Sequence, residues 1–184
     1  RALRAVAETG LLDRKRKAGT RVATHPVRTA KLTIPIIRQE IEQQKRAYSH
    51  MLVASDLLPP PLHVRAHMKL VENSAALYVE AVHMADQRPY VYETRWINPE
   101  SVPDVLDLDL ANNNANEWLV AHAPFTRGDI EISAVQADAK LADIFNTQIN
   151  DALIVVDRTT WNIDQSITMV RLIYHAGYRL RTVV

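Results

Sequence analysis

Two segments rich in β-forming residues, 76–84 and 90–97, flank the turn sequence Asp86-Gln87-Arg88-Pro89. This spacing predicts a β-hairpin, because a short polar turn joins neighbouring antiparallel strands. A second pair of strand-like segments, 152–161 and 167–174, has the same arrangement. Two long hairpins restrict the chain to folds that are built around an antiparallel sheet.

Helical patterns lie between the predicted strands. We expect helices over about 35–45, 63–68, 116–122 and 138–145, a short helix or loop over 99–109, and further strands at 48–58, 130–135 and 179–183. The predicted fold class is therefore α+β, with helices packed against an antiparallel sheet.

Composition excludes several classes of protein. The 184 residues suffice for one full-sized domain and a small appendage. No apolar run approaches the roughly 18 residues of a membrane span, and the absence of cysteine excludes thiolate catalysis and Cys-ligated zinc. His63 and His67 have the spacing of a metal pair, but no glutamate follows His63 and no third ligand is evident. We expect a cytoplasmic protein with no metal, no cofactor and no catalytic residues.

Positive charge is concentrated at the start of the chain. The first 28 residues hold eight basic and two acidic side chains, whereas the remainder holds 14 basic and 19 acidic ones. The pattern predicts a short helix that ends at Gly10, followed by a hairpin with a basic tip at 15–19. Such a tip can neutralise DNA phosphates, although a solvated basic loop has the same composition. The candidate DNA contacts are Arg1, Arg4, Arg14, Lys15, Arg16, Lys17, Gly19 and Thr20.

Candidate ligand residues lie in both long hairpins. Alternate residues of a strand share a face, so Glu93 and Arg95 are expected side by side, as an ion pair at a cavity wall or as a structural pair. In the second hairpin an arginine can hold a carboxylate, and an aromatic ring can stack on a planar group, although core and surface roles explain these residues equally well. The candidates in that hairpin are Arg158, Thr160, Trp161, Arg171 and Tyr174.

Several segments resemble a known family of regulators. The start of the chain resembles the second half of a GntR-type winged helix-turn-helix, and the rest resembles the UTRA effector domain, most closely its histidine-utilisation repressor branch. The residues that carry the resemblance are Gly19-Thr20-Arg21-Val22-Ala23, His83-Met84-Ala85-Asp86-Gln87-Arg88-Pro89-Tyr90, Glu93-Thr94-Arg95-Trp96-Ile97-Asn98-Pro99 and Arg158-Thr159-Thr160-Trp161.

The resemblance implies a division of the chain. Residues 1–24 would be the end of a recognition helix and the wing, residues 25–31 a linker, and residues 32–184 an effector domain with a chorismate-lyase-like fold. It also implies that the recognition helix begins before Arg1, so we expect the DNA-binding domain to be only partly present.

The resemblance further implies a function and a ligand. Glu93 matches a position that faces the small molecule in related effector domains. His83 stands where relatives with phosphorylated effectors have an arginine, and its imidazole can donate a hydrogen bond to a carboxylate. The effector of the branch is urocanate, a planar carboxylate with an imidazole ring. We therefore expect a homodimeric repressor that binds operator DNA and is controlled by urocanate. The alternatives are a regulator that senses a sugar phosphate or phosphonate, and a chorismate-lyase-like enzyme.

Overall fold

The computed structural model describes residues 36–180 in full and the backbone of residues 12–15 and 19–22. Contacts divide the chain into two compact units, of which residues 35–178 form the larger. In the smaller unit, β1 (Leu12–Lys15) and β2 (Gly19–Val22) form an antiparallel pair, with Lys15 opposite Gly19. The predicted hairpin at the start of the chain is therefore present, while the helix predicted before it lies outside the described residues.

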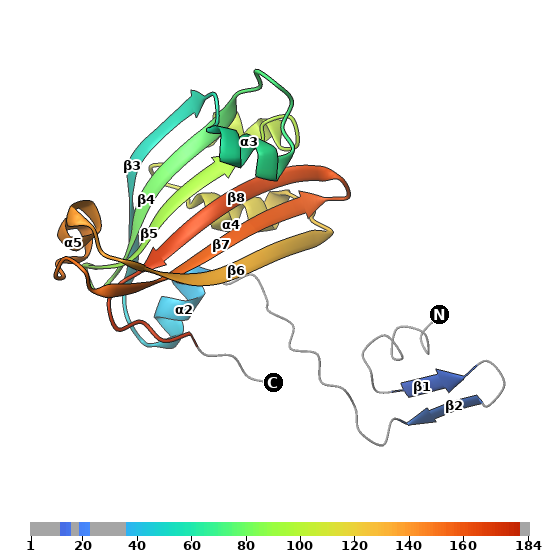
Figure 1. The fold of residues 1–184 in the computed structure, drawn as a ribbon, viewed down its shortest axis with the longest axis horizontal. Helices are drawn as coiled ribbons and strands as arrows, with labels where there is room; N and C mark the ends of the chain where they lie inside the picture. The colour runs from blue at the N-terminus through green and yellow to red at the C-terminus, as the bar shows by residue number, and fades with distance from the viewer. Residues whose placement is uncertain (1–11, 16–18, 23–35, 181–184) are drawn as a thin grey trace. The chain divides into compact units, whose positions relative to one another are not determined.

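The larger unit is built on one six-stranded sheet in the order β3-β4-β5-β8-β7-β6, with every neighbouring pair antiparallel. The two predicted hairpins are β4–β5 and β7–β8, and they lie side by side at the centre of the sheet (Figure 1). This confirms the predicted α+β class. The strands are β3 (Tyr48–Leu58), β4 (Ala76–Ala85), β5 (Arg88–Ile97), β6 (Arg127–Gln136), β7 (Ala152–Asn162) and β8 (Gln165–Tyr174).

Both long hairpins turn more tightly than the sequence predicted. The first turn consists of Asp86 and Gln87, which both have positive φ, at 52° and 62°. Two consecutive residues in this region match the right-handed twist of antiparallel strands, so the strands pair directly up to the turn. Arg88 and Pro89, predicted as part of the turn, consequently belong to β5.

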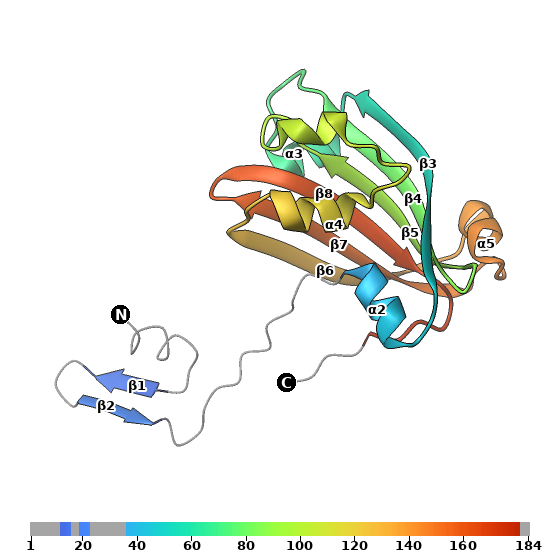
Figure 2. The ribbon, with the colours of Figure 1, turned by 180° about the vertical axis from the view of Figure 1, so that it is seen from behind.

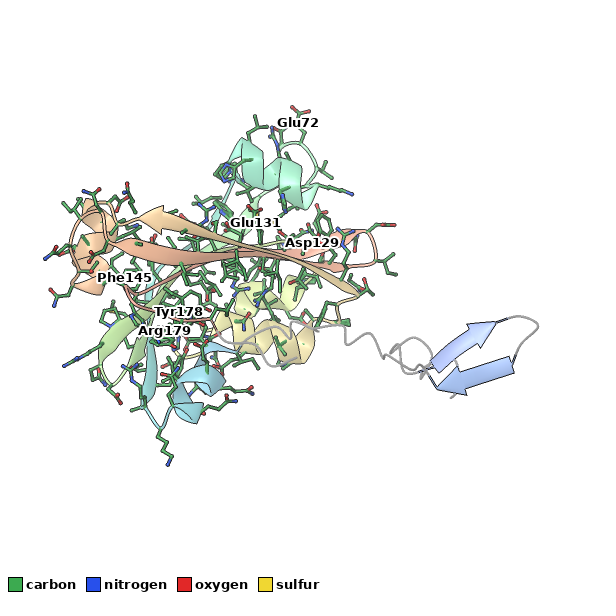
Figure 3. All side chains as sticks on the ribbon, turned by 60° about the horizontal axis from the view of Figure 1, so that its bottom comes forward. Glu72, Asp129, Glu131, Phe145, Tyr178 and Arg179 are labelled. Carbon is green, nitrogen blue, oxygen red and sulfur yellow. The ribbon has the colours of Figure 1, made fainter. Side chains whose placement is uncertain are left out.

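Helices cover both faces of the sheet (Figures 1 and 2). One face carries α2 (Ile37–Gln43), α4 (Ala115–His122) and the short 3-10 helix η1 (Pro103–Asp107); the other carries α3 (Leu62–Met68) and α5 (Ala139–Phe145). Figure 3 shows α3 on the opposite side of the sheet from α2 and α4, with side chains filling the layer between the sheet and α4. The site described below lies in that layer.

Apolar side chains at helical spacing anchor these helices. Ile37 and Ile41 of α2 are buried against Val91, Val170 and Leu172 of the central strands. On the opposite face Leu141, Ala142 and Phe145 of α5 pack against residues of β4, β5, β7 and β8, among them Val82, Tyr92, Val155 and Ile173.

The last predicted strand, 179–183, is wrong where it can be checked. Arg179 and Leu180 lie outside any strand, and residues 181–183 are outside the described part of the chain. A turn at Ala176 and Gly177 follows β8, and Gly177 has a φ of 79° there. Tyr178 then stacks on Tyr174, with 3.9 Å between ring centroids. Because β5 and β7 already occupy both sides of β8, Arg179 and Leu180 have no free edge of β8 to pair with.

Asp138 caps α5, and its side chain accepts a hydrogen bond of 2.8 Å from the backbone N–H of Leu141. Replacing Asp138 by alanine leaves this N–H without its partner, which should cost about 1 kcal/mol. We expect a lower urea midpoint for Asp138→Ala and a nearly normal one for Asp138→Ser, because serine caps equally well. Equal midpoints for the two variants would contradict a capping role.

Candidate functional site

Five polar side chains, four from three strands and one from α4, meet between the sheet and α4 with at most 3% of their surface exposed. We call this group the buried polar cluster; it consists of His83, Glu93, Arg95, Asn116 and Arg158. Buried polar groups are unfavourable unless they are paired, so the pairing within this group indicates what the site can bind.

Glu93 is the only carboxylate in the buried polar cluster. Its Oε1 accepts from Arg95 Nε at 2.6 Å, and its Oε2 lies 2.9 Å from His83 Nε2. Burial opposes ionisation, but Arg95 and the hydrogen bond from His83 outweigh it and hold the pKa of Glu93 well below its usual range. Glu93 is therefore ionised, and it forms the ion pair with Arg95 that alternation along β5 predicts.

The hydrogen bonds around His83 specify its tautomer. Because Glu93 can only accept, His83 Nε2 carries the proton and donates it, while His83 Nδ1 accepts from the Tyr48 hydroxyl at 2.9 Å. Asn114 donates to the same hydroxyl at 2.9 Å. Burial raises the pKa of Tyr48, so the phenol keeps its proton. In this arrangement His83, Glu93 and Tyr48 each have a hydrogen-bond partner.

Arg158 has no acidic partner among the described residues. Its Nη2 donates to Asn116 Oδ1 at 2.5 Å, whereas its Nε and Nη1 are buried without a hydrogen-bond partner in the described part of the chain. Burial and the neighbouring Arg95 lower its pKa to about 10, which still leaves it protonated at neutral pH. Two arginines and one carboxylate make the buried polar cluster positively charged, so an anion is the ligand that would compensate it.

A small pocket lies beside the buried polar cluster. His83 and Glu93 belong to both the pocket wall and the buried polar cluster. The complete lining is His50, Leu52, Val79, Ala81, His83, Glu93, Leu110, Asn113, Asn114 and Ala115.

The structure brings most of the predicted ligand residues to one face of the sheet. His83, Glu93, Arg95 and Arg158 are members of the buried polar cluster. Thr160 is buried two residues beyond Arg158 on the same strand, opposite Thr168, and the Thr168 hydroxyl accepts a hydrogen bond from Arg95.

Tyr174 lies on the same sheet face as Glu93 but within an aromatic group. It is buried between Tyr90 and Tyr178, with ring centroids 6.3 Å and 3.9 Å away. Its ring therefore has protein neighbours rather than an open surface on which a ligand could stack.

Arg171 and Trp161 do not join the site, which corrects the sequence prediction. Arg171 points to the other face of the sheet, because its neighbour Leu172 is the residue opposite Glu93. There it binds both oxygens of Asp157, at 2.8 Å each. Trp161 follows a register shift in β7, and its indole N–H donates to Asp129 on β6.

Sequence reasoning missed the two asparagines of α4. Asn114 immediately precedes α4 and caps it by accepting from the N–H of Glu117 at 3.0 Å. An asparagine three residues before a glutamate is a helix-start signal that could have located this cap. No pattern in the sequence indicates that Asn116 reaches Arg95 and Arg158.

The candidate DNA contacts fall partly outside the described residues. Arg14 and Lys15 lie on β1, and Gly19 and Thr20 lie on β2. Arg1, Arg4, Arg16 and Lys17 lie outside the described part of the chain. A DNA-binding role for these residues stays a prediction.

The described residues contain neither a metal-binding group nor a membrane-spanning helix. No group of three or more histidine, aspartate or glutamate side chains there could hold a metal ion. No helix in that part of the chain is both long and apolar enough to cross a membrane.

The sequence of the larger unit matches a known protein family. Residues 43–181 match the sequence model of the UTRA domain. The chain belongs to the UTRA domain family. This confirms the resemblance found in the sequence, and the fold matches as well. The matched residues include the six-stranded sheet together with α3, η1, α4 and α5.

Relatives of the whole chain include two histidine utilization repressors. The protein of Klebsiella aerogenes is 27% identical over 183 residues, which cover 98% of this chain and 76% of the relative. That of Pseudomonas putida is 26% identical over 181 residues, covering 98% and 73%.

Solved structures share the fold of the UTRA domain. The C-terminal domain of the histidine utilization repressor from Pseudomonas syringae pv. tomato matches with a TM-score of 0.69 at 22% identity, over 75% of this chain and 99% of that one. PhnF from Mycobacterium smegmatis matches with a TM-score of 0.72 at 20% identity, over 98% and 80%.

Proposed function

We propose that this chain is a ligand-responsive transcriptional repressor whose UTRA domain binds a small carboxylate, with urocanate as the first candidate. The relatives that match almost the whole chain are histidine utilization repressors. These relatives are regulators rather than enzymes, which supports a non-enzymatic role and argues against the chorismate-lyase-like alternative.

The positive charge of the buried polar cluster carries the proposal. Arg158 has two buried nitrogens, Nε and Nη1, without a partner among the described residues. A carboxylate that binds Arg158 in a bidentate arrangement would accept from Nη2 together with one of them, and Nη2 is the nitrogen that now donates to Asn116. Glu93, which lines the pocket, can accept a hydrogen bond from a ring N–H. Urocanate combines these two features, because a short unsaturated linker joins its carboxylate to an imidazole ring.

DNA binding and dimerisation belong to the same proposal. We assign residues 1–24 to a partial winged helix-turn-helix, 25–31 to a linker and 32–184 to the effector domain. The basic residues of the β1–β2 hairpin would contact operator phosphates. Two such heads are needed to reach two half-sites, so the repressor would act as a homodimer in the cytoplasm.

Urocanate should stabilise the protein against heat. At a concentration of 100 times its Kd, a ligand adds about 2.7 kcal/mol to the free energy of unfolding, which for a domain of this size raises Tm by roughly 5–10 °C. We expect this shift with urocanate, measured by differential scanning fluorimetry at pH 7, and a smaller one with imidazole propionate. An unchanged Tm at millimolar urocanate would exclude it as the effector.

A sugar phosphate or phosphonate is the second candidate ligand. Two arginines lie in the buried polar cluster, and phosphate sites commonly collect arginines. Arg95 is already paired with Glu93, however, which leaves one arginine for the anion. Sugar phosphates and phosphonates in the same thermal series decide between the two classes, because the true effector class should give the larger shift.

A further inference from the structure

The first turn of α4 lies between the buried polar cluster and α2, and its side chains reach both. We propose that this turn transmits effector binding to α2, with Asn116 as the sensing residue and the Glu117–Arg38 ion pair as the output. The inference rests on the proposed function, since it describes how occupancy of the UTRA domain would reach the DNA-binding head.

Asn116 occupies the position that an anion would take. Its amide oxygen accepts from Arg95 Nη2 at 3.2 Å and from Arg158 Nη2 at 2.5 Å. A carboxylate is a stronger acceptor than an amide, since hydrogen bonds between ionised partners are roughly twice as strong as neutral ones. An effector carboxylate that binds Arg158 would therefore compete with Asn116 and displace the start of α4.

Asn114 holds the same turn at a second point. Its amide nitrogen donates to the Tyr48 hydroxyl at 2.9 Å, and its amide oxygen caps the N–H of Glu117 at 3.0 Å. Tyr48 is also bonded to His83, which lines the pocket. Changes at His83 or at Arg158 consequently reach the same turn of α4.

Arg38 connects this turn to α2. Its Nε donates to both carboxylate oxygens of Glu117, at 2.9 and 3.1 Å, and its guanidinium lies 4.3 Å from the centre of the Tyr48 ring. Arg38 thus contacts both α4 and the residue that binds His83. In the sequence α2 is the first helix after the segment that joins the body to the basic head, so a shift of α2 changes the point where that segment enters the body.

The ion pair is suited to transmission rather than to stability. The side chains of Arg38 and Glu117 are 41% and 31% exposed, and partly exposed pairs of this kind contribute little to folding. Variants of this pair are therefore expected to fold normally, so a change in their response can be assigned to coupling.

The test uses the protein with its complete DNA-binding domain. Urocanate binding is measured by isothermal titration calorimetry, and operator binding by fluorescence anisotropy with and without saturating urocanate. For Arg38→Gln and Glu117→Gln we expect a urocanate Kd within about threefold of wild type, as neither residue touches the proposed carboxylate site. The effect of urocanate on operator affinity, typically 5- to 150-fold for coupled sites, should fall below about threefold.

Two further variants sharpen the test. The double variant R38E/E117R restores an ion pair in reverse and should recover most of the urocanate response. Arg171→Gln removes a comparably exposed ion pair on the other face of the sheet and should respond like wild type. A wild-type response in Arg38→Gln and Glu117→Gln would overturn the transmission route while leaving the proposed function intact.

Asn116→Asp tests the sensing step. The new carboxylate would lie between Arg95 and Arg158, where it imitates the bound effector. We expect urocanate binding at least tenfold weaker than in wild type, and operator affinity without urocanate close to that of urocanate-saturated wild type. Wild-type values for both quantities would overturn the sensing role of Asn116. If wild-type protein shows neither heat nor a change in operator affinity with urocanate, the proposed function fails and the inference fails with it.

Discussion

Replacing Arg158 by methionine is expected to weaken urocanate binding strongly while leaving the ligand-free protein at least as stable as before. The two effects have opposite signs because the Arg158 charge is buried without an acidic partner among the described residues. A buried unpaired cation destabilises the folded state, and an apolar side chain of similar length removes that penalty. The bond to Asn116 is lost, but Asn116 still accepts from Arg95.

The loss of affinity for Arg158→Met should be large. Removing one partner of a buried charged hydrogen bond costs about 2–5 kcal/mol of binding free energy, which corresponds to roughly 30-fold to several thousand-fold in Kd. Calorimetry measures the affinity, and urea unfolding of the ligand-free protein measures the stability.

Arg171→Met is the matched control. Arg171 is also an arginine on a central strand, but it is half-exposed on the opposite face and paired with Asp157. We expect its urocanate affinity to equal that of wild type. The assignment of Arg158 as the carboxylate-binding residue fails if Arg158→Met still binds urocanate with wild-type affinity.

Among the proposed variants, Glu93→Gln should cause the largest loss of folding stability. Glu93 is the carboxylate that compensates Arg95, with both side chains at most 2% exposed. Without it two buried arginines share one site, and no acidic group among the residues that the structure describes neutralises either of them. Breaking a buried pair in this way costs about 3–5 kcal/mol, which lowers Tm on the order of 10 °C.

The dependence on pH gives a second signature of Glu93. Its pKa in the folded protein lies below the unfolded value of about 4.3. Between these two values the unfolded chain binds more protons, so the contribution of Glu93 is fully present above the unfolded pKa and declines as pH falls further. The stability difference between wild type and Glu93→Gln should therefore shrink between about pH 5 and pH 3.

Unfolding can be followed by tryptophan fluorescence, because Trp96, Trp118 and Trp161 all lie in the larger unit. Asp138→Ser serves as a control, since it keeps a capping residue far from the buried polar cluster. If the stability difference between wild type and Glu93→Gln stays constant from pH 5 to pH 3, the negative charge of Glu93 is not the source of the loss.

The sequence predicted those parts of the site that local geometry controls. The β4–β5 hairpin was predictable because its strands are adjacent in the chain and a polar turn separates them. Glu93 and Arg95 could be placed on one face because side chains alternate along a strand. Alternation also separates Arg171 from Leu172, but the sequence does not say which of the two faces Glu93; the pairing of β5 with β8 decides that.

Only the tertiary structure decided how separate elements combine. Arg158 and Arg95 lie on either side of Val170, because β8 lies between β5 and β7 in the sheet. Asn116 joins them because α4 packs over that face. The sequence by itself determined the hairpins, the antiparallel α+β class, the Glu93–Arg95 pair and the family. Apolar surface is buried between residues that are distant in the chain. This long-range packing sets the strand order, the bulge before Trp161 and the docking of α4, and it thereby assembles the buried polar cluster.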